Sequence, residues 1–222
     1  MSDLDEIKVD LGKVNRAIKL QVPLIMKTFT VPRKFEHYIE QVVTIYMDHI
    51  KQGSLCNNVI YCIKELVVNA KKANTKRVYF IDRGLDLNNN NDYNQGMSTF
   101  KDDTLNNLDY YLDLQRQKGL YVKLLLHLQD NTIIIEVRNN STITSSELNR
   151  IQKRLNQARE YRNMEEAIFQ LMDESEGAGL GLVILVSMLK GLGLESDAFK
   201  ILKTEKETVA RIIIPKNIKK AS

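Results

Sequence analysis

The feature that most constrains this chain is a run of three alternating glycines that leads directly into an apolar segment. Gly177, Gly179 and Gly181 are spaced two residues apart, and residues 182–189 follow as a predicted helix. Glycine permits backbone angles closed to residues with a Cβ, and it leaves room for an anion beside main-chain N–H groups. A helix beginning here would direct its N-terminal amides and its dipole at that anion. The segment therefore predicts either a phosphate-binding loop or a glycine-rich helix cap, and the glycines alone do not separate the two.

Two common glycine motifs do not fit this segment. A Walker loop requires Gly-Lys-Ser/Thr after the glycines, and none follows here. A dinucleotide-binding fingerprint requires a preceding β-strand, whereas residues 172–176 are polar. Any phosphate site in this chain is therefore of another kind.

Composition limits both the size and the partners of the fold. With 222 residues, 43% of them hydrophobic, the chain is long enough for one sizeable core and short for two. Its 32 basic and 28 acidic residues give a net charge of only +4, without an arginine-rich arm, so nucleic-acid binding is not expected. No apolar run approaches ~20 residues, and the N-terminus lacks the charge order of a signal peptide. We expect one main domain, no membrane association and a cytoplasmic location.

Neither a disulfide nor a metal cluster is expected. Cys56 and Cys62 are six residues apart in one predicted helix, which separates them by about 9 Å, too far for a disulfide. The three histidines, His37, His49 and His127, do not have the spacing of a ligand set.

Hydrophobic periodicity predicts an α/β chain whose strands cluster in hairpins. Strands are expected at 23–31, 76–81, 120–128, 132–137, 198–204 and 208–215. Helices are expected at 33–52, 56–74, 104–118, 145–158, 164–172 and 182–192. Because the long helices carry apolar stripes, the predicted fold is a two-layer α/β sandwich with a mixed, mostly antiparallel sheet and helices on one face.

The same pattern suggests how the chain is organised. Apolar residues between 4 and 18 predict an amphipathic N-terminal helix within residues 1–22, packed either on the domain or on a second copy of the chain. Residues 23–222 form the domain. A polar stretch at about 82–119, with turns expected at Gly84 and Gly96, is interpreted as an insertion.

The predicted helix at 56–74 carries a second informative cluster. Glu65, Asn69 and Lys72 fall at i, i+4 and i+7 on one polar face, beside an apolar stripe. A carboxylate, an amide and an ammonium in a row suit a metal-bound phosphate. An isolated Glu-x-x-x-Asn is also common as a solvated pair, and the spacing alone leaves both interpretations open.

These motifs occur in an order that resembles a known superfamily. Glu65-Leu-Val-Val-Asn69-Ala is followed by a strand ending in Val137-Arg-Asn-Asn-Ser141, by Gly177-Ala-Gly-Leu-Gly-Leu182, and by a last strand that begins at Thr208. Together they resemble the ATP-binding domain shared by histidine kinases, DNA gyrase, a class of heat-shock chaperones and mismatch-repair ATPases, the GHKL superfamily. The resemblance covers roughly residues 23–216, and the layout is most similar to that of the anti-sigma-factor serine kinases.

The resemblance implies a histidine-kinase-like ATPase fold, ATP and Mg²⁺ as ligands, and a role for each matching residue. Asn69 would bind the Mg²⁺, Glu65 would act as the catalytic base, and Lys72 would contact phosphate. Thr208 and Asn139 would lie at the adenine. The residues that would wrap the phosphates are Gly177, Gly179, Leu180, Gly181 and Leu182. The helices between 145 and 176 would form a lid over the nucleotide.

The chain also departs from the family's pattern. The usual Asp-x-Gly-x-Gly, whose acid binds the adenine amine, is matched here by Asn139, Ser141 and Ile143. A neutral acceptor is weaker than a carboxylate by ~1 kcal/mol, so restoring the acid is expected to tighten ATP binding. Ile143 does not readily adopt positive φ, so this loop must be built differently. None of the histidines opens a long two-helix hairpin, which makes a serine/threonine kinase a better expectation than an autophosphorylating histidine kinase.

The sequence thus supports two functional hypotheses. The first is an ATP-binding regulatory protein in signal transduction that phosphorylates or sequesters a partner regulator in a nucleotide-dependent way, with a homodimer left open. The alternative is a non-catalytic, nucleotide-gated interaction module with a degenerate adenine site. A third outcome, in which no nucleotide binds, also stays open.

Overall fold

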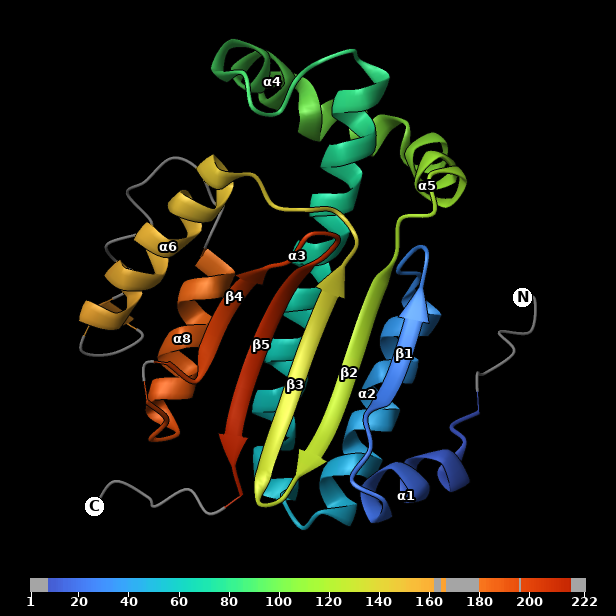
Figure 1. The fold of residues 1–222 in the computed structure, drawn as a ribbon, viewed down its shortest axis with the longest axis vertical. Coiled ribbons are helices and arrows are strands. Elements are labelled where there is room, and N and C mark those ends of the chain that lie inside the picture. Colours follow the sequence, from blue (N-terminus) through green and yellow to red (C-terminus); the bar gives the residue numbers. More distant parts are fainter. Residues whose placement is uncertain (1–7, 162–164, 167–179, 196, 217–222) are drawn as a thin grey trace.

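The structure is a computed structural model of the chain, and it describes residues 8–161, 165–166, 180–195 and 197–216. Figure 1 shows a single sheet with helices behind it and two further helices above its upper end. The strands are β1 (Leu24–Thr28), β2 (Val122–Gln129), β3 (Thr132–Asn139), β4 (Phe199–Lys203) and β5 (Thr208–Pro215). The helices are α1 (Leu11–Lys19), α2 (Arg33–His49), α3 (Cys56–Asp82), α4 (Asn90–Asn106), α5 (Leu108–Gln117), α6 (Ser145–Glu160) and α8 (Leu180–Gly191), with a 3-10 turn at Gly53–Leu55.

The sheet has the strand order β1-β2-β3-β5-β4, and every described neighbour pair is antiparallel. Helices α2, α3 and α8 cover one face (Figure 1). The predicted two-layer α/β sandwich is confirmed. The β2–β3 hairpin turns at Asp130 and Asn131 as expected, with Asp130 at a φ of 53°, a conformation that Asp tolerates better than most residues.

The main core lies between the sheet and its three covering helices. One row of paired residues crosses all five strands on the covered face, and all of its members are buried: Leu24, Leu126, Ile135, Ile212 and Phe199. Side chains from the covering helices meet this row, among them Val43 of α2, Ile63 of α3 and Leu185 of α8, which are fully buried. The period-2 pattern of the strands and the 3.6 period of the helices therefore bury their apolar sides against each other. From α1, Val14 and Ala17 join this core.

The strand predicted at 76–81 is wrong. The chain there continues as α3, which runs without interruption from Cys56 to Asp82. Val78, Tyr79 and Phe80 had suggested a strand because β-branched and aromatic residues fit a pleated, half-buried surface. Here they are buried in a second, smaller core, packed on Phe100 of α4 and Tyr111 of α5. Tertiary packing outweighs their strand propensity.

The insertion is more helical than its sequence indicated. Residues 90–106 form α4, capped by the Asn89 side chain, although the sequence predicts no helix here before residue 104. The single helix expected at 104–118 is interrupted at Asn107, between α4 and α5. Gly96 does not form a turn: it lies inside α4, where an added Cβ would stand 2.6 Å from Cζ of Phe80. Its small size lets α4 approach α3 closely.

Other boundaries shift by a few residues. Helix α6 is capped by Thr144 rather than Ser145, and Glu147 completes a capping box. Most of the helix expected at 164–172, and with it the middle of the proposed lid, lies outside the described residues. Among the described residues, none of the helices combines the length and the apolar character needed to cross a bilayer.

Candidate functional site

The first polar cluster lies where α3 meets the start of α8. Asn69 Nδ2 donates a hydrogen bond of 3.0 Å to Glu65 Oε1, one helical turn earlier, and both side chains are half-buried. The Glu65 carboxylate lies against Gly181, in the first turn of α8: a Cβ built on Gly181 would stand 1.9 Å from Glu65 Oε1. The fold therefore brings together two motifs that are more than a hundred residues apart in the chain.

Gly181 has a clear steric role. It lies within α8, and its lack of a side chain gives room to an anion, the Glu65 carboxylate. A carboxylate near a helix N-terminus is stabilised by the helix dipole, so one interpretation is that Glu65 simply caps α8. The other is that α8 holds the carboxylate in place beside Asn69 for chemistry. Both interpretations use the same contact.

The remaining residues expected around the phosphates are placed less directly. Lys72 is exposed on α3, one turn beyond Asn69. Leu182 is buried and Leu180 packs against the main core, so only their main-chain atoms could face a ligand. Gly177 and Gly179 lie outside the described residues.

A second polar cluster lies further along α3, at the ends of β3 and β5. Asn74 is fully buried; its Nδ2 donates to the main-chain oxygen of Tyr121 at 3.0 Å. Its Oδ1 accepts from Ser141 Oγ at 3.0 Å and from Asn139 Nδ2 at 3.3 Å. Asn139 Nδ2 also donates to Ser141 Oγ at 2.6 Å and to Ser141 O at 3.3 Å. Since carbonyl oxygens only accept, the contacts to Tyr121 O and Ser141 O determine how both amides are oriented.

Thr208 ties the segment after β3 to β5. Its hydroxyl donates to Ser141 O at 2.7 Å and accepts from Ile143 N at 3.0 Å. Ile143 is buried, at a position where the family's pattern has glycine. The residues expected at the adenine, Asn139 and Thr208, are therefore brought together, but their hydrogen bonds go to the protein itself.

A cluster of charged side chains on the α6 side holds the segment after β3 in place. The Glu147 carboxylate accepts from Lys76 Nζ at 3.0 Å and from Arg77 Nη2 at 2.6 Å, and Arg77 Nη2 also donates to Thr142 O at 3.0 Å. Burial acts to raise the pKa of Glu147, but the hydrogen bond from Arg77 and the charges of Lys76 and Arg77 outweigh it and lower that pKa to about 2.

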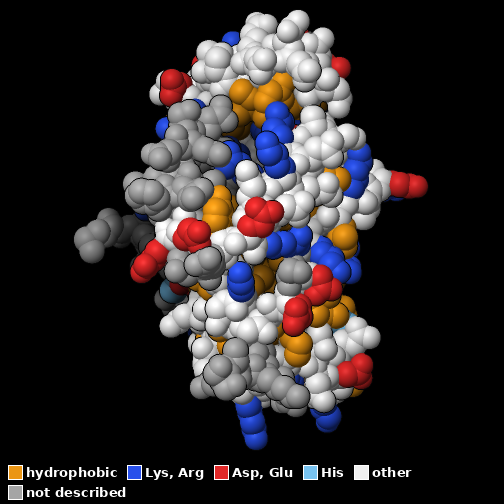
Figure 2. Space-filling model, turned by 90° about the vertical axis from the view of Figure 1, so that its left-hand side faces the viewer, with side chains coloured by type: hydrophobic (Ala, Val, Ile, Leu, Met, Phe, Trp, Pro, Cys, Tyr) orange, Lys and Arg blue, Asp and Glu red, His pale blue; other side chains and the backbone are white. Residues whose placement is uncertain are grey.

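The insertion touches this cluster through one aromatic ring. The Arg150 guanidinium of α6 lies 4.3 Å from the Tyr93 ring centroid, and Lys76 Nζ lies 5.5 Å from it. Figure 2, seen from the side of α6 and α8, shows Lys and Arg side chains over the upper and middle parts of this face, with acidic side chains among them and below. Tyr93 of α4 therefore connects the insertion to both α3 and α6.

Sequence reasoning missed Asn74, Glu147 and Arg77, although the first two left a signal. Asn74 continues the apolar stripe of Ile63, Val67 and Ala70 at helical spacing, which marks it as a buried polar residue. Thr144-x-x-Glu147 matches a capping box. The role of Arg77 depends on contacts 65 and 70 residues away and left no local signal.

The two clusters are spaced along one helix. Asn69 and Asn74 are five residues apart, a rise of about 7.5 Å. A ligand that contacted both would have to lie along α3. The cavity of about 220 Å³ that the structure describes is elsewhere, between α6, α8 and β4, and none of the sequence-predicted site residues with a described position lines it.

Neither a metal site built from protein ligands alone nor a reactive thiol is found in the described part of the chain. No group of three His, Cys, Asp or Glu side chains there is placed to hold a metal ion. Cys56 and Cys62 are buried and free, as expected, and burial raises the pKa of Cys62 to about 12, which keeps the thiol protonated.

Comparison with known proteins shows one clear relationship. The chain is 45% identical over 213 residues to an uncharacterized protein of Treponema pallidum (strain Nichols), an alignment that covers 96% of this chain and 42% of the relative. The chain thus spans less than half the length of the curated relative it matches. No family model matches the chain, and no solved structure matches it.

Proposed function

We propose that this protein binds Mg-ATP at the junction of α3 and α8, and that it phosphorylates or sequesters a partner regulator according to its nucleotide state. The observation that carries the proposal is the half-buried Glu65–Asn69 pair held against Gly181. The resemblance to the GHKL superfamily supplies the ligand, and a cytoplasmic location is part of the same proposal.

The hydrogen bond within the pair gives each side chain a separate task. Because the Glu65 carboxylate only accepts, Asn69 must direct its Nδ2 at Glu65, which leaves Asn69 Oδ1 for a cation. A hard cation such as Mg²⁺ prefers oxygen ligands, and it would neutralise charge on the triphosphate. Glu65 keeps a second carboxylate oxygen to accept a proton.

The proposed reaction is transfer of the γ-phosphoryl group to a serine or threonine hydroxyl of the partner. Glu65 takes the proton of that hydroxyl, the hydroxyl oxygen forms the new P–O bond, and ADP leaves with the electrons of the broken bond. The N-terminal amides of α8, and Lys72 on the exposed face of α3, would steady the phosphates. With water in place of the hydroxyl, the same arrangement hydrolyses ATP.

A second function, a non-catalytic interaction module, is favoured by the other cluster. The side chains of Asn139, Ser141 and Asn74 are hydrogen-bonded to one another and buried, and Ile143, two residues further along, is also buried. An adenine could use these groups only after some of their bonds were broken. If this end stays closed, nucleotide binds weakly and the segment serves as part of an interaction surface.

One experiment separates these functions. The full chain is incubated with Mg-ATP labelled at the γ-phosphate, alone and with cell extract, and nucleotide binding is measured in parallel by calorimetry. Label in free phosphate or in a second protein supports the catalytic proposal. Saturable binding without transfer supports the non-catalytic module. Absence of binding at millimolar nucleotide overturns both.

Variants on α3 and α8 test the placement of the site. Asn69→Ala is expected to weaken ATP affinity and turnover together, while Lys64→Ala, an exposed neighbour on the same helix, leaves both unchanged. Gly181→Ala places a methyl group where the Glu65 carboxylate now lies, so the carboxylate must move. We expect Gly181→Ala to lower turnover more than affinity. Unchanged turnover in Gly181→Ala would show that the position of Glu65 is not used.

A further inference from the structure

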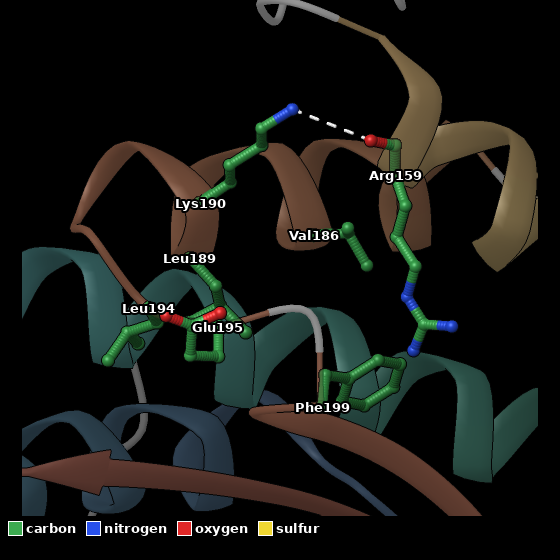
Figure 3. A pocket seen from close by; sticks show the side chains of 7 residues that line it. All are labelled: Arg159, Val186, Leu189, Lys190, Leu194, Glu195 and Phe199. Carbon is green, nitrogen blue, oxygen red and sulfur yellow. Dashed lines mark hydrogen bonds between the residues drawn. The ribbon is translucent and has the colours of Figure 1, made fainter.

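The cavity between α6, α8 and β4 lies apart from both polar clusters on α3. Its lining residues are Arg159, Val186, Leu189, Lys190, Leu194, Glu195 and Phe199. Figure 3 shows the Arg159 side chain extending from α6 toward the Phe199 ring, with Val186 beside its stem and Glu195 on the opposite side. The walls are therefore mainly apolar, with a cation at one side.

Arg159, which lines this cavity, carries an unsatisfied donor. Its Nη1 donates to Asn156 Oδ1 at 3.0 Å, but its Nε is buried and has no hydrogen-bond partner among the residues that the structure describes. Buried polar groups are nearly always paired, and a buried donor on a charged group is especially costly to leave unmade. An acceptor with negative charge, supplied by a ligand, would complete the guanidinium's bonding.

Lys190 adds positive charge beside the cavity without filling it. Its Nζ donates to Tyr161 O at 2.9 Å and to Arg159 O at 3.4 Å, and Figure 3 shows it turned away from the cavity. These two bonds tie α8 to the end of α6, so Arg159 is held at a rigid junction. The electrostatic environment on this side favours an anion.

The size of the cavity limits the ligand. At about 220 Å³ it is smaller than the roughly 300–1,000 Å³ of sites for drug-sized ligands, so it suits a small metabolite. Val186, Leu189 and Phe199 offer apolar contacts to the body of such a molecule. A charged ligand without an apolar part would leave these apolar walls in contact with water.

We propose that this cavity binds a small monocarboxylate with an apolar body, whose carboxylate pairs with Arg159 while its apolar part contacts Val186, Leu189 and Phe199. Arg159 supplies charge and direction, since a guanidinium can bind a carboxylate through two N–H groups. Glu195, at the far side, disfavours a second negative charge. The site is separate from the proposed nucleotide site, so neither proposal depends on the other.

The test uses the full chain and follows the methyl groups of Val186 and Leu189 by NMR. The probes are 4-methylpentanoate, the matched amine 4-methylpentylamine, and acetate, which keeps the carboxylate but has almost no apolar body. We expect saturable shifts with 4-methylpentanoate and none with the other two at the same concentration. Equal binding of the amine, or no saturable shift with the carboxylate, would overturn the proposal.

Two variants and one control locate the carboxylate. Arg159→Met keeps an apolar stem and removes the charge, and we expect it to weaken 4-methylpentanoate affinity by about 10-fold or more. Val186→Phe fills the cavity and should abolish binding. Lys153→Met, on the exposed surface of α6, should leave affinity unchanged. Undiminished binding in Arg159→Met would contradict the assignment, and the probe comparison in the unaltered chain stands even if that variant fails to fold.

Discussion

The two polar clusters on α3 are built from similar residues but use them differently. At the α8 end, one hydrogen bond joins Glu65 to Asn69, and both side chains stay partly exposed with acceptor atoms to spare. At the sheet end, Asn74, Asn139 and Ser141 are buried and bonded to one another. Since a polar group bound within the protein is unavailable to a ligand, the first cluster is suited to binding and the second to holding the fold together.

The largest effect should come from Glu65, the proposed catalytic base. Glu65→Gln keeps the shape and one hydrogen-bond acceptor but removes the proton acceptor, so turnover should fall roughly 10²–10⁴-fold while ATP affinity stays close to that of the wild type. Phosphate release and calorimetry on the same samples measure the two quantities. If Glu65→Gln and Asn69→Ala lost affinity equally, Glu65 would be a structural cap of α8, and the contrast between the two clusters would disappear.

The ion cluster at the sheet end should contribute to the unfolding free energy, and this contribution should depend on pH. Because the pKa of Glu147 is lowered to about 2 in the folded protein, its contribution is fully present above the unfolded pKa near 4.5 and is lost as the pH falls toward 2. A shift of this size corresponds to about 3 kcal/mol. Glu147→Gln should therefore lower the unfolding free energy by about 3 kcal/mol at pH 7, measured by urea denaturation.

The pH series supplies the check on Glu147. The difference between wild type and Glu147→Gln should shrink through pH 4 and vanish near pH 2. Glu160→Gln, at the exposed end of the same helix, serves as the control and should change stability little at any pH. A difference that is constant with pH would mean that packing, rather than charge, accounts for the effect.

Asn139→Asp is a direct test of whether the sheet end binds a ligand. The family's pattern predicts tighter ATP binding for this change. The packing predicts instead a loss of about 2 kcal/mol of stability at pH 7, because a carboxylate would face two acceptors, Asn74 Oδ1 and Ser141 O. These acceptors would raise the folded pKa of the new acid, so the loss should be small below about pH 3.9 and grow as the pH rises.

Calorimetry and denaturation of Asn139→Asp decide between the two expectations. Asn139→Ser, which removes the amide without adding a charge, is the control for loss of the amide's own hydrogen bonds. Tighter ATP binding without lost stability would show that this end opens for adenine, and the distinction drawn between the clusters would fail.

The smallest effect is expected at Thr208. Thr208→Val keeps the shape but removes the hydroxyl that accepts from Ile143 N and donates to Ser141 O, so we expect a loss of about 1 kcal/mol in unfolding free energy. Thr208→Ser should restore most of it. A large loss of ATP affinity in Thr208→Val with unchanged stability would instead place Thr208 in the nucleotide site.

Much of the architecture could be predicted from the sequence, because the spacing of apolar residues shows which side of each helix or strand is buried. Strands such as Thr132–Asn139 alternate, helices such as Arg33–His49 repeat apolar residues every three to four positions, and the antiparallel hairpin turns at Asp130. The end of α3 could not be predicted in this way. Val78, Tyr79 and Phe80 have strand propensity, and they are helical here because they pack against α4 and α5.

The candidate site shows the same division. Glu65 and Asn69 are one helical turn apart, and their spacing alone predicts that they share one face of the helix. The contact of Glu65 with Gly181 joins distant segments, and although the resemblance implied that they meet, it did not imply that the glycine makes room for the carboxylate. The partners of Asn139 were not predicted. Hydrogen bonds between side chains depend on which segments come close in the folded chain, and the spacing of residues in the sequence does not give this.

The uninterrupted run of α3 has a consequence for how the molecule unfolds. At 27 residues the helix is about 40 Å long, and its two halves belong to different cores, the sandwich and the insertion. Loss of α4 and α5 would leave Val78, Tyr79 and Phe80 facing water at the end of a helix whose other half still packs on the sheet. Unfolding of either core would weaken the helix against which the other core packs. The insertion is thus a cooperative part of the fold, and denaturation curves followed at its tyrosines and at the sheet should coincide.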